Sequence, residues 1–477
     1  MPEVIPRSPQ TSYWIREATS REPLESFPAL SGDASADVVV VGGGYTGLWT
    51  AWFLTERAPG IDVAVVEANR CGFGPSGRNG GFLTGWWDEA DELAARYGDE
   101  AGLRSCRALS ESIAAIDEWC RQHSLDAWYR NSGWIGVASA PAQEGSLRRA
   151  VDACRRLGVD EELRDLSPAE VQEACRSPVF GGGVFMRDGA TVQPARLAFG
   201  LRREVAARGV RIFEGSRVVR VASERPGPGS PVVAETADGR VRAGRAVLSM
   251  GPWSAGWPGL PRFVLVRGSY ILVTAPAPDR VEALGWTSGP CISDFRTALH
   301  YFRSTPDGRI AFGGAGRAEW GTRATAKHDF DPGAMDALRR DFRRFFPDFD
   351  EVPIEEAWGG PVDVSSLHHP VFGTLPPGNV HYALGFTGNG VGPSHLAGRV
   401  LSALATDADD PVTALPMVNR RPRRFPPAPL SSMGAYVVQS AISRKERVED
   451  EGGRAGALTR LVATLPRRIG YALGPRR

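Results

Sequence analysis

The stretch DVVVVGGGYTGLWTAWFL, residues 37–54, decides the fold. Its valine run, residues 38–41, is β-branched and uninterrupted, which predicts a short strand buried on both faces. Gly42, Gly44 and Gly47 follow with the spacing G-x-G-x-x-G, and an apolar helical pattern begins among them. Glycines in such a turn let the backbone approach a pyrophosphate, which the N-terminus of the helix stabilises. The stretch therefore predicts a strand, a phosphate-binding turn and a helix.

A second strand pattern, IDVAVVEA at residues 61–68, comes after the helix and contains Glu67 near its end. This acid lies twenty residues after Gly47, about where a βαβ dinucleotide site places its ribose-binding carboxylate. An acid here favours the unphosphorylated ribose of FAD or NAD over that of NADP. The sequence thus predicts a Rossmann-like nucleotide-binding domain.

Composition narrows the class of protein. The net charge of +1 offers no case for nucleic-acid binding. None of the six cysteines has a metal-binding spacing, which predicts reduced thiols and no metal site. The N-terminus lacks an apolar leader, and no run approaches the roughly 18 apolar residues of a membrane span. These features predict a cytoplasmic protein without a transmembrane helix.

Several motifs together resemble the D-amino-acid-oxidase-like family of FAD-dependent oxidoreductases. They are VVVVGGGYTGLWTA, GPSGRNGGF (74–82), HYFRSTPDGRIAFGG (300–314), WGGPVDV (358–364) and GFTGNGVGPSHLAGR (385–399). The match covers roughly residues 33–405 and is most similar to the branch of γ-glutamylputrescine oxidase-like enzymes. The resemblance implies a two-domain flavoprotein of the D-amino-acid-oxidase and glycine-oxidase type. It would combine an α/β, Rossmann-like FAD-binding domain with an α+β substrate domain whose sheet is mostly antiparallel.

The order of the patterns predicts that the FAD-binding domain is interrupted by the substrate domain. An N-terminal arm, expected to be extended and pinned by Tyr13 and Trp14, precedes both. The expected divisions are the arm at 1–32, the FAD-binding domain at 33–87, 188–258 and 357–415, the substrate domain at 88–187 and 259–356, and a basic C-terminal tail at 416–477.

Carried over by residue, the resemblance implies a set of FAD contacts. The first glycine turn would hold the pyrophosphate, the end of the second strand the adenosine ribose, and residue 218 the adenine. The second glycine loop would run under the flavin, residue 251 would close on the pyrophosphate, and the last glycine loop would approach the pyrimidine edge of the flavin. The residues are Gly42, Gly44, Tyr45, Thr46, Gly47, Glu67, Ala68, Ser76, Gly77, Arg78, Asn79, Gly80, Gly81, Val218, Gly251, Gly388, Asn389, Gly390 and Val391.

Covalent attachment of the flavin is not expected. Relatives that attach it use a cysteine before the last strand or a histidine beside the second glycine loop. Here WGGPVDVSSLHHPVFG (358–373) contains no cysteine, and GPSGRNGG (74–81) contains no histidine. The prediction is therefore FAD bound non-covalently.

The family chemistry is hydride transfer from the carbon that bears an amine to N5 of the flavin, which gives an imine that water hydrolyses. Relatives that oxidise free amino acids often hold the carboxylate with an arginine after the WGG-like strand or in the last glycine loop. Residues 361–363 and 387–389 contain no arginine, which argues against a simple α-amino acid. Asp363 would either hold a cationic amine or cap a loop.

The other catalytic candidates lie on predicted strands of the substrate domain. His300 and Tyr301 are neighbours, so alternation sends only one of them to a given face. Tyr270 is expected to face the pocket. Arg309 is the basic residue nearest to the place where sarcosine-oxidase-like relatives carry a lysine that activates oxygen. Because that lysine is not evident, the electron acceptor is either oxygen or an electron carrier.

Three functions fit the pattern. The first is oxidation of a primary or secondary amine, such as a polyamine or a γ-glutamyl amine. The second is oxidation of an amino acid or N-methyl amino acid, whose carboxylate would bind an arginine such as Arg296 or Arg303. The third is a flavoprotein that acts on a biosynthetic intermediate tethered to a carrier.

The tail stands apart in charge. Residues 417–477 hold thirteen arginine or lysine residues and four acidic residues. Its last part, LTRLVATLPRRIGYALGPRR, is amphipathic and basic, which is typical of contact with a membrane surface. A solvated tail, or packing in an oligomer, is the alternative.

Overall fold

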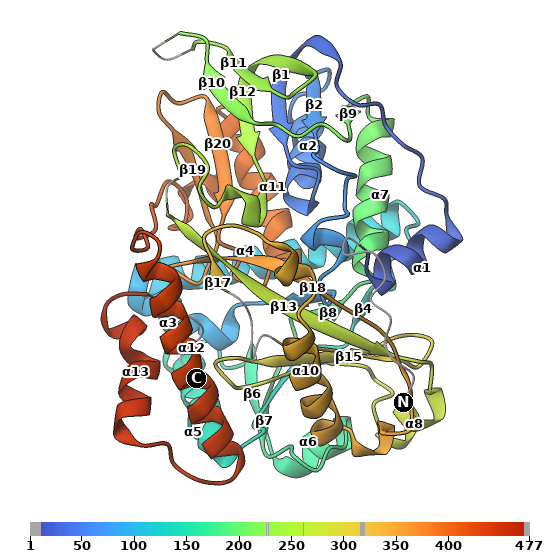
Figure 1. The fold of residues 1–477 in the computed structure, drawn as a ribbon, viewed down its shortest axis with the longest axis vertical. Coiled ribbons are helices and arrows are strands. Elements are labelled where there is room, and N and C mark those ends of the chain that lie inside the picture. The colour runs from blue at the N-terminus through green and yellow to red at the C-terminus, as the bar shows by residue number, and fades with distance from the viewer. Residues whose placement is uncertain (1–10, 226, 228, 261, 315–319, 472–477) are drawn as a thin grey trace.

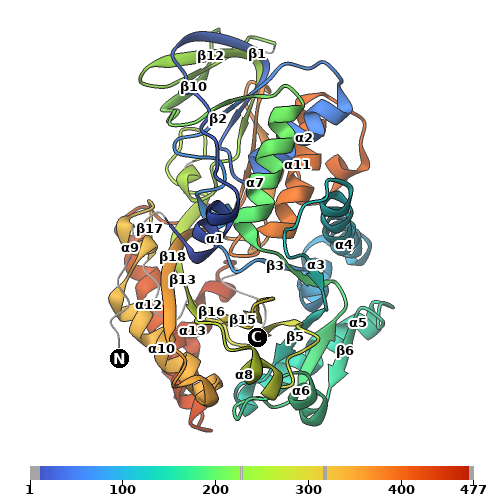
Figure 2. The ribbon, with the colours of Figure 1, turned by 90° about the vertical axis from the view of Figure 1, so that its right-hand side faces the viewer.

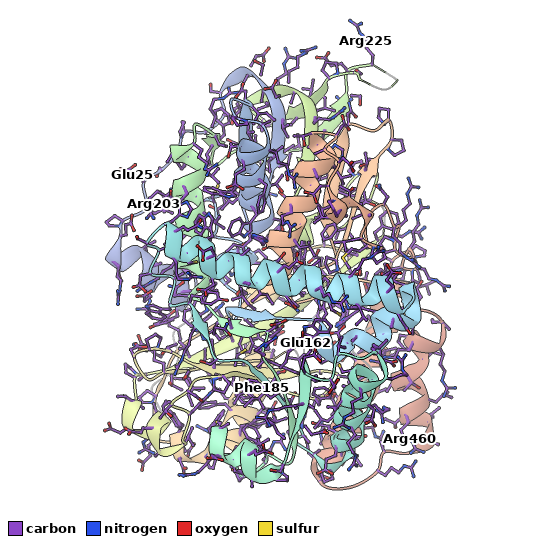
Figure 3. All side chains as sticks on the ribbon, turned by 180° about the vertical axis from the view of Figure 1, so that it is seen from behind. Glu25, Glu162, Phe185, Arg203, Arg225 and Arg460 are labelled. Carbon is purple, nitrogen blue, oxygen red and sulfur yellow. The ribbon has the colours of Figure 1, made fainter. Side chains whose placement is uncertain are left out.

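The computed structural model describes residues 11–225, 227, 229–260, 262–314 and 320–471 of the 477. Figure 1 shows two halves, each built around a sheet, one above the other. The long helix α4 (Asp99–Gln122) crosses the molecule between them, as Figure 3 shows from behind. The first ten and last six residues of the predicted arm and tail lie outside the described residues.

The upper half contains an eight-stranded sheet. Four parallel strands form its centre in the order β12-β1-β2-β9, and β20 extends it in parallel on the far side of β12. The predicted valine strand is the end of β1, where Val39 and Val40 are fully buried. The strands are β1 (Gly32–Val41), β2 (Val63–Val66), β9 (Arg211–Phe213), β10 (Arg220–Ser223), β11 (Val232–Glu235), β12 (Gly239–Leu248), β19 (Val371–Leu375) and β20 (Val380–Leu384).

Three helices, α2 (Tyr45–Arg57), α7 (Pro194–Ala207) and α11 (Val391–Ala405), lie together beside this sheet (Figure 2). Helices α2 and α11 approach closely, because a Cβ added to Gly398 would lie 2.6 Å from the Cβ atom of Trp49. The parallel sheet and its helices confirm the predicted Rossmann-like half.

The lower half contains a nine-stranded sheet that is antiparallel except where β14 pairs with β5. This confirms the predicted α+β half. Its longest pair is β13 with β18, so the division expected at residue 357 lies inside a strand of this sheet. The strands are β5 (Trp134–Val137), β6 (Leu163–Leu166), β7 (Gly183–Met186), β13 (Val264–Thr274), β14 (Cys291–Asp294), β15 (His300–Ser304), β16 (Ile310–Gly314), β17 (Trp320–Gly321) and β18 (Ile354–Ser365).

Shorter elements connect and cover the two sheets. A small sheet of β3 (Phe82–Thr84), β8 (Gly189–Thr191) and β4 (Arg130–Asn131) lies between them. The remaining helices of the body are α3 (Ala90–Tyr97), α5 (Glu144–Arg156), α6 (Pro168–Ala174), α8 (Pro278–Ala283), α9 (Ala326–Asp329) and α10 (Pro332–Phe345), and the tail forms α12 (Leu430–Asp450) and α13 (Ala457–Arg468). Among the described helices, none combines the length and apolarity that a membrane crossing needs.

The N-terminal arm differs from the expectation of an extended chain. Residues 13–21 form helix α1, whose first turn is capped by the Ser12 hydroxyl, which accepts a hydrogen bond from the Ile15 amide. Tyr13 and Trp14 are both buried and do pin the arm to the body. The helix is therefore stabilised by a cap together with burial, and burial depends on the tertiary fold.

A buried charged cluster joins β15 to α10 in the lower half. The Nδ1 atom of His300 lies 2.8 Å from Asp294, and its Nε2 atom lies 3.1 Å from Asp341. Burial lowers the pKa of His300, but the charge and hydrogen bond of Asp294 more than offset this and bring the pKa to about 9. Arg296 and Arg344 lie near the same acids. His300 is thus a cation that holds two elements of the substrate half together.

The raised pKa makes the contribution of His300 to stability depend on pH. It is fully present below the unfolded pKa of 6.5 and is lost as pH rises through about 9. We expect His300→Asn to lower the free energy of unfolding by about 3–5 kcal/mol below pH 6.5. The difference from the parent protein should narrow above pH 9, as urea unfolding at several pH values would show.

His381→Asn is the matched control, because burial lowers the pKa of His381 to about 4 and this histidine stays neutral across the same range. A constant difference between His300→Asn and the parent protein at all pH values would contradict the charged state of His300.

Candidate active site

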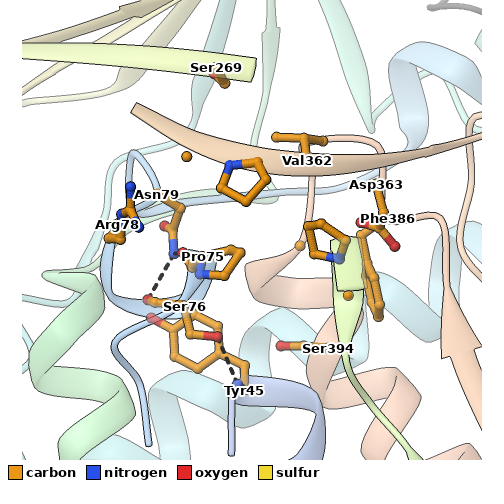
Figure 4. Close-up of a pocket in the computed structure, with 18 of the residues that line it drawn as sticks. Tyr45, Pro75, Ser76, Arg78, Asn79, Ser269, Val362, Asp363, Phe386 and Ser394 are labelled. Carbon is orange, nitrogen blue, oxygen red and sulfur yellow. Dashed lines mark hydrogen bonds between the residues drawn. The ribbon is translucent and has the colours of Figure 1, made fainter. Parts of the chain in front are cut away.

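A cavity of about 590 Å³ lies between the two halves of the molecule. Sixteen of the predicted FAD contacts line it, from six separate segments of the chain. They are Gly42, Gly44, Tyr45, Thr46, Glu67, Ala68, Ser76, Arg78, Asn79, Gly80, Val218, Gly251, Gly388, Asn389, Gly390 and Val391. Figure 4 shows part of this lining, with Tyr45 and Ser76 opposite Val362 and Asp363.

Three predicted contacts, Gly47, Gly77 and Gly81, do not line the cavity. Each instead allows a close approach of backbone. A Cβ on Gly47 would lie 1.9 Å from the carbonyl oxygen of Gly42, and one on Gly81 would lie 2.1 Å from that of Val192. These glycines therefore shape the site by allowing close packing, and they do not line the cavity.

The first glycine turn offers a place for an anion. Gly42 has φ +108°, and a Cβ there would lie 2.6 Å from the Ser249 carbonyl oxygen. Helix α2 begins directly after Gly44, which has no side chain to cap it, and its first residues, Tyr45 and Thr46, line the cavity. Ser76 of the second glycine loop accepts a hydrogen bond of 2.8 Å from the Tyr45 amide and joins the two loops (Figure 4). This arrangement fits a pyrophosphate.

The end of the cavity beyond this turn fits a nucleoside. Glu67 accepts hydrogen bonds from the amides of Gly43 (2.7 Å) and Asn69 (2.8 Å), which hold its carboxylate in place. Burial raises the pKa of Glu67, and these two amides partly oppose the rise. Arg217 and Val218 line the cavity beside it. An acceptor for ribose hydroxyls and an apolar surface for a base thus lie next to the anion site.

At the opposite end, Asp363 braces the last glycine loop. Its carboxylate accepts a hydrogen bond of 2.5 Å from the Gly385 amide, and its carbonyl oxygen accepts one from Thr387. Burial raises the pKa of Asp363 to about 6, although the backbone N–H groups act to lower it. Of the two roles expected for Asp363, these contacts match the loop cap. The loop leads into α11, whose first residue, Val391, also lines the cavity.

The second glycine loop is tied to the lower sheet by Arg78. Its guanidinium forms an ion pair of 2.6 Å with Asp329 and donates to the carbonyl of Gly359. The backbone carbonyl of Arg78 accepts a hydrogen bond from the indole of Trp358. The loop expected to run under the flavin is therefore fixed to β18.

Tyr301 faces the cavity and His300 does not, which settles the alternation on β15. The Tyr301 hydroxyl lies 3.0 Å from that of Ser269, and a Cβ on Gly80 would lie 2.8 Å from the tyrosine ring. Tyr301 thus packs against the second glycine loop, where the flavin ring is expected.

Two other candidates do not line the cavity, which corrects their expected placement. Tyr270 points to the opposite face of β13 and donates its hydroxyl to the Lys327 carbonyl. Arg309 forms ion pairs with Asp307 and Glu355 near the surface, because its side chain leaves the strand away from the cavity. Neither position suits contact with substrate.

The residue-level prediction missed Arg267, which lines the cavity from β13. Its guanidinium lies 5.2 Å from the ring centre of Trp320, and burial lowers its pKa to about 10. The suggested anchors do not line the cavity: Arg296 pairs with Asp294 and Asp450, and Arg303 donates to the Val192 carbonyl. The alternation of side chains along β13 could have indicated that Arg267 lines the cavity, because residues 267, 269 and 271 share one face.

Two carboxylates also line the cavity and were not predicted. They belong to Asp88 and Glu89, which follow β3. Glu89 lies 3.0 Å from the Nε2 atom of His369 and 3.8 Å from that of His368. Arg267, Asp88 and Glu89 thus add a guanidinium and two carboxylates to the cavity wall, besides the carboxylate of Asp363.

The inner side of helix α12 supports the wall of the cavity. A tail that only lay on the surface would make no such contacts. Its Gln439 accepts a hydrogen bond from the indole of Trp320, and its Glu446 accepts one of 3.0 Å from the Ala298 amide. Trp320 and the neighbours of Ala298, Thr297 and Leu299, line the cavity. The tail thus contributes to the site from behind.

The residues present fit FAD. Two helix N-termini, a buried carboxylate and a glycine-lined cradle meet in one cavity, and they lie in the order ribose, pyrophosphate and flavin edge. Among the described residues that line the cavity there is no cysteine, and His368 is the histidine among them; non-covalent binding stays a prediction.

Comparison with known proteins agrees with this geometry. The family model described as FAD dependent oxidoreductase (DAO) matches residues 37–404. The chain is 29% identical over 432 residues to a γ-glutamylputrescine oxidoreductase of Escherichia coli, covering 89% of this chain and 96% of the relative. It is 30% identical over 407 residues to a probable oxidoreductase, OrdL, of Rhizobium meliloti, covering 84% and 89%.

The fold is also that of a solved flavoprotein. The crystal structure of glycine oxidase from Geobacillus kaustophilus superimposes with a TM-score of 0.65 at 21% identity, covering 81% of this chain and 99% of that one. These findings confirm the family resemblance, the two-part fold and FAD as the cofactor. The chain belongs to the DAO family of FAD-dependent oxidoreductases.

Proposed function

We propose that this protein oxidises the C–N bond of a primary or secondary amine of the polyamine or γ-glutamyl-amine type. The observation that carries the proposal is the pair of carboxylates, Asp88 and Glu89, in the wall of a cavity that also meets the flavin loops. Carboxylates attract a cationic amine, and the aromatic rings of Phe82 and Tyr301 suit its apolar chain. The γ-glutamylputrescine oxidoreductase among its relatives supports the same substrate class.

In this proposal the eight-stranded sheet is the core of the FAD-binding domain and the nine-stranded sheet that of the substrate domain. FAD, when bound, would accept a hydride, which carries the electron pair, from the carbon next to nitrogen. The chain holds the amine, shields it from water with Tyr301 and Val362, and places N–H groups of the last glycine loop where negative charge develops. Water then hydrolyses the imine product.

A second candidate is oxidation of an amino acid or N-methyl amino acid, and Arg267 favours it. A guanidinium in the cavity wall can hold a carboxylate through two hydrogen bonds. The missing arginine at residues 361–363 and 387–389 therefore no longer excludes a substrate that carries a carboxylate. The two candidates differ in whether the substrate must carry a carboxylate next to the oxidised amine.

The first test is anaerobic loss of flavin absorbance in the holoenzyme on mixing with amines, polyamines, γ-glutamyl amines and amino acids. We expect bleaching by amines, including γ-glutamyl amines, and not by simple α-amino acids. Bleaching by amino acids alone would favour the second candidate. If neither free amines nor amino acids reduce the flavin, both candidate functions are contradicted. A substrate tethered to a carrier is then favoured. Reoxidation of the reduced enzyme by oxygen and by an artificial carrier would then identify the acceptor.

Arg267→Met is predicted to discriminate between substrates. For an amine that carries a carboxylate, KM should rise about ten- to a hundredfold, because a charge-assisted contact is lost. For a simple diamine, KM should stay close to that of the parent enzyme. Arg309→Met, outside the cavity, is the matched control and should change neither value. Equal effects of Arg267→Met on both amines would indicate a structural role for Arg267.

Asp363→Ala is predicted to weaken FAD binding about ten- to a hundredfold, because the buried Gly385 amide loses its acceptor. Asp363→Asn keeps one acceptor oxygen and should be intermediate. In the parent protein, FAD affinity should fall as pH drops below about 6, where Asp363 takes up a proton and accepts hydrogen bonds less well. Titration of the apoprotein with FAD measures each case.

The pH dependence should vanish in Asp363→Asn, which has no proton to gain. Asp307→Asn, on an acid outside the cavity, is the control and should bind FAD like the parent protein. An unchanged slope in Asp363→Asn would show that another group titrates.

A further inference from the structure

We propose that the C-terminal hairpin, helices α12 and α13 with Ile469, docks the protein on the surface of an anionic lipid bilayer. The two helices contact each other and lie side by side at the edge of the lower half (Figure 1). This surface is separate from the cavity and takes no part in the proposed oxidation.

Exposed apolar side chains gather on this hairpin. Eight large apolar residues there have exposed fractions between 42% and 73%. They are Leu430, Met433, Tyr436, Val437, Leu458, Leu461, Leu465 and Ile469. Elsewhere in the described part of the chain, only Val219 and Trp253 reach a comparable exposure. Such clustering differs from the scattered exposed apolar residues of an ordinary surface.

The spacing of these residues places them along one face of each helix. On α12, residues 430, 433 and 437 are separated by three and four positions, and on α13 residues 458, 461 and 465 repeat the same spacing. Side chains with this spacing lie above one another on a helix. Each helix therefore presents an apolar stripe to the solvent.

The charges of the hairpin are sorted between its two sides. Three of its acids face inward or are paired: Glu446 accepts from the Ala298 amide, Asp450 pairs with Arg296, and Glu449 pairs with Lys445. Exposed arginines are Arg444, Arg447, Arg454 and Arg468. Figure 3 shows Arg460 of α13 projecting from the edge of the molecule. The outward surface is thus apolar and mainly cationic, with Glu451 as the exposed acid of the described hairpin.

Charge complementarity favours a lipid surface over a second copy of the chain. Apolar side chains enter the boundary between headgroups and acyl chains, while arginines meet lipid phosphates. Two hairpins facing each other would bring arginines against arginines, and like charges repel. An anionic bilayer supplies both the apolar layer and the opposite charge.

The inward side of α12 gives this docking a defined position relative to the cavity. Gln439 and Glu446 hold Trp320 and Ala298 from behind the substrate end. A bilayer bound to the outer side would therefore lie one helix thickness from that wall.

The test is sedimentation of the purified holoenzyme with vesicles of phosphatidylcholine alone or mixed with phosphatidylglycerol. We expect binding only to the mixed vesicles, weakened by salt. The triple variant Arg444→Ser, Arg447→Ser, Arg468→Ser should bind about a hundredfold more weakly, since each cation near an anionic surface contributes about fivefold. Leu458→Ser, Leu461→Ser, Leu465→Ser should also lose binding.

Val219→Ser and Arg148→Ser are matched controls, because both residues are exposed but lie outside the hairpin. They should bind vesicles like the parent protein. Flavin absorbance and melting temperature should be unchanged in all variants, which excludes loss of folding as the cause. Absence of binding to the mixed vesicles would overturn the proposal. Equal binding to both vesicle types would also overturn it. A dimer in sedimentation equilibrium that the leucine variant dissociates, without vesicle binding, would assign the surface to a second copy.

Discussion

The contact between Gly47 and Gly42 is the constraint on which the rest of the structure depends. A Cβ atom added to residue 47 would lie only 1.9 Å from the carbonyl oxygen of Gly42. Helix α2 can therefore pack on β1 only because position 47 is glycine. That packing sets the N-terminus of α2 against the carboxyl ends of the parallel strands. Helix α11 lies against α2 through Gly398. One short backbone contact thereby aims two helix N-termini at the same cavity.

Strand β18 carries this arrangement into the second sheet. Near its middle, the Trp358 indole holds the backbone of the second glycine loop. Toward its end, Asp363 holds the last glycine loop through the Gly385 amide. Two loops that are about three hundred residues apart in sequence are thus fixed by one strand. Because β18 pairs along β13, the substrate wall and the flavin loops cannot shift independently.

The nucleotide end could be predicted from sequence because its physics is local. The glycine spacing, the valine run and the acid at residue 67 each act within a few residues of their positions. Gly42, Gly44 and Glu67 line the cavity, whereas Gly47 packs against Gly42. Alternation on β15 correctly limited the choice between His300 and Tyr301. The direction of that choice depends on what packs against each face: α10 with Asp341 on one side, the glycine loop on the other.

The substrate end could not be read in this way, because it arises from pairing between distant strands. Arg267 reaches the cavity through the register of β13 with Trp320 and Val362, and no local pattern announces that register. Arg309 lies directly before β16, and ion pairs with Asp307 and Glu355 hold its side chain outside the cavity. A residue type on a strand thus predicts chemistry only after the neighbours of that strand are known.

Net charge illustrates the same limit in the C-terminal hairpin. The whole chain has a net charge of +1, although residues 417–477 carry thirteen basic and four acidic side chains. Counting alone suggests a diffuse basic tail. In the fold, the acids Glu446 and Asp450 turn inward. Glu446 accepts a hydrogen bond from the Ala298 amide, and Asp450 forms an ion pair with Arg296. The cations left outside adjoin exposed apolar side chains, so the potential of this surface is stronger than the composition indicates.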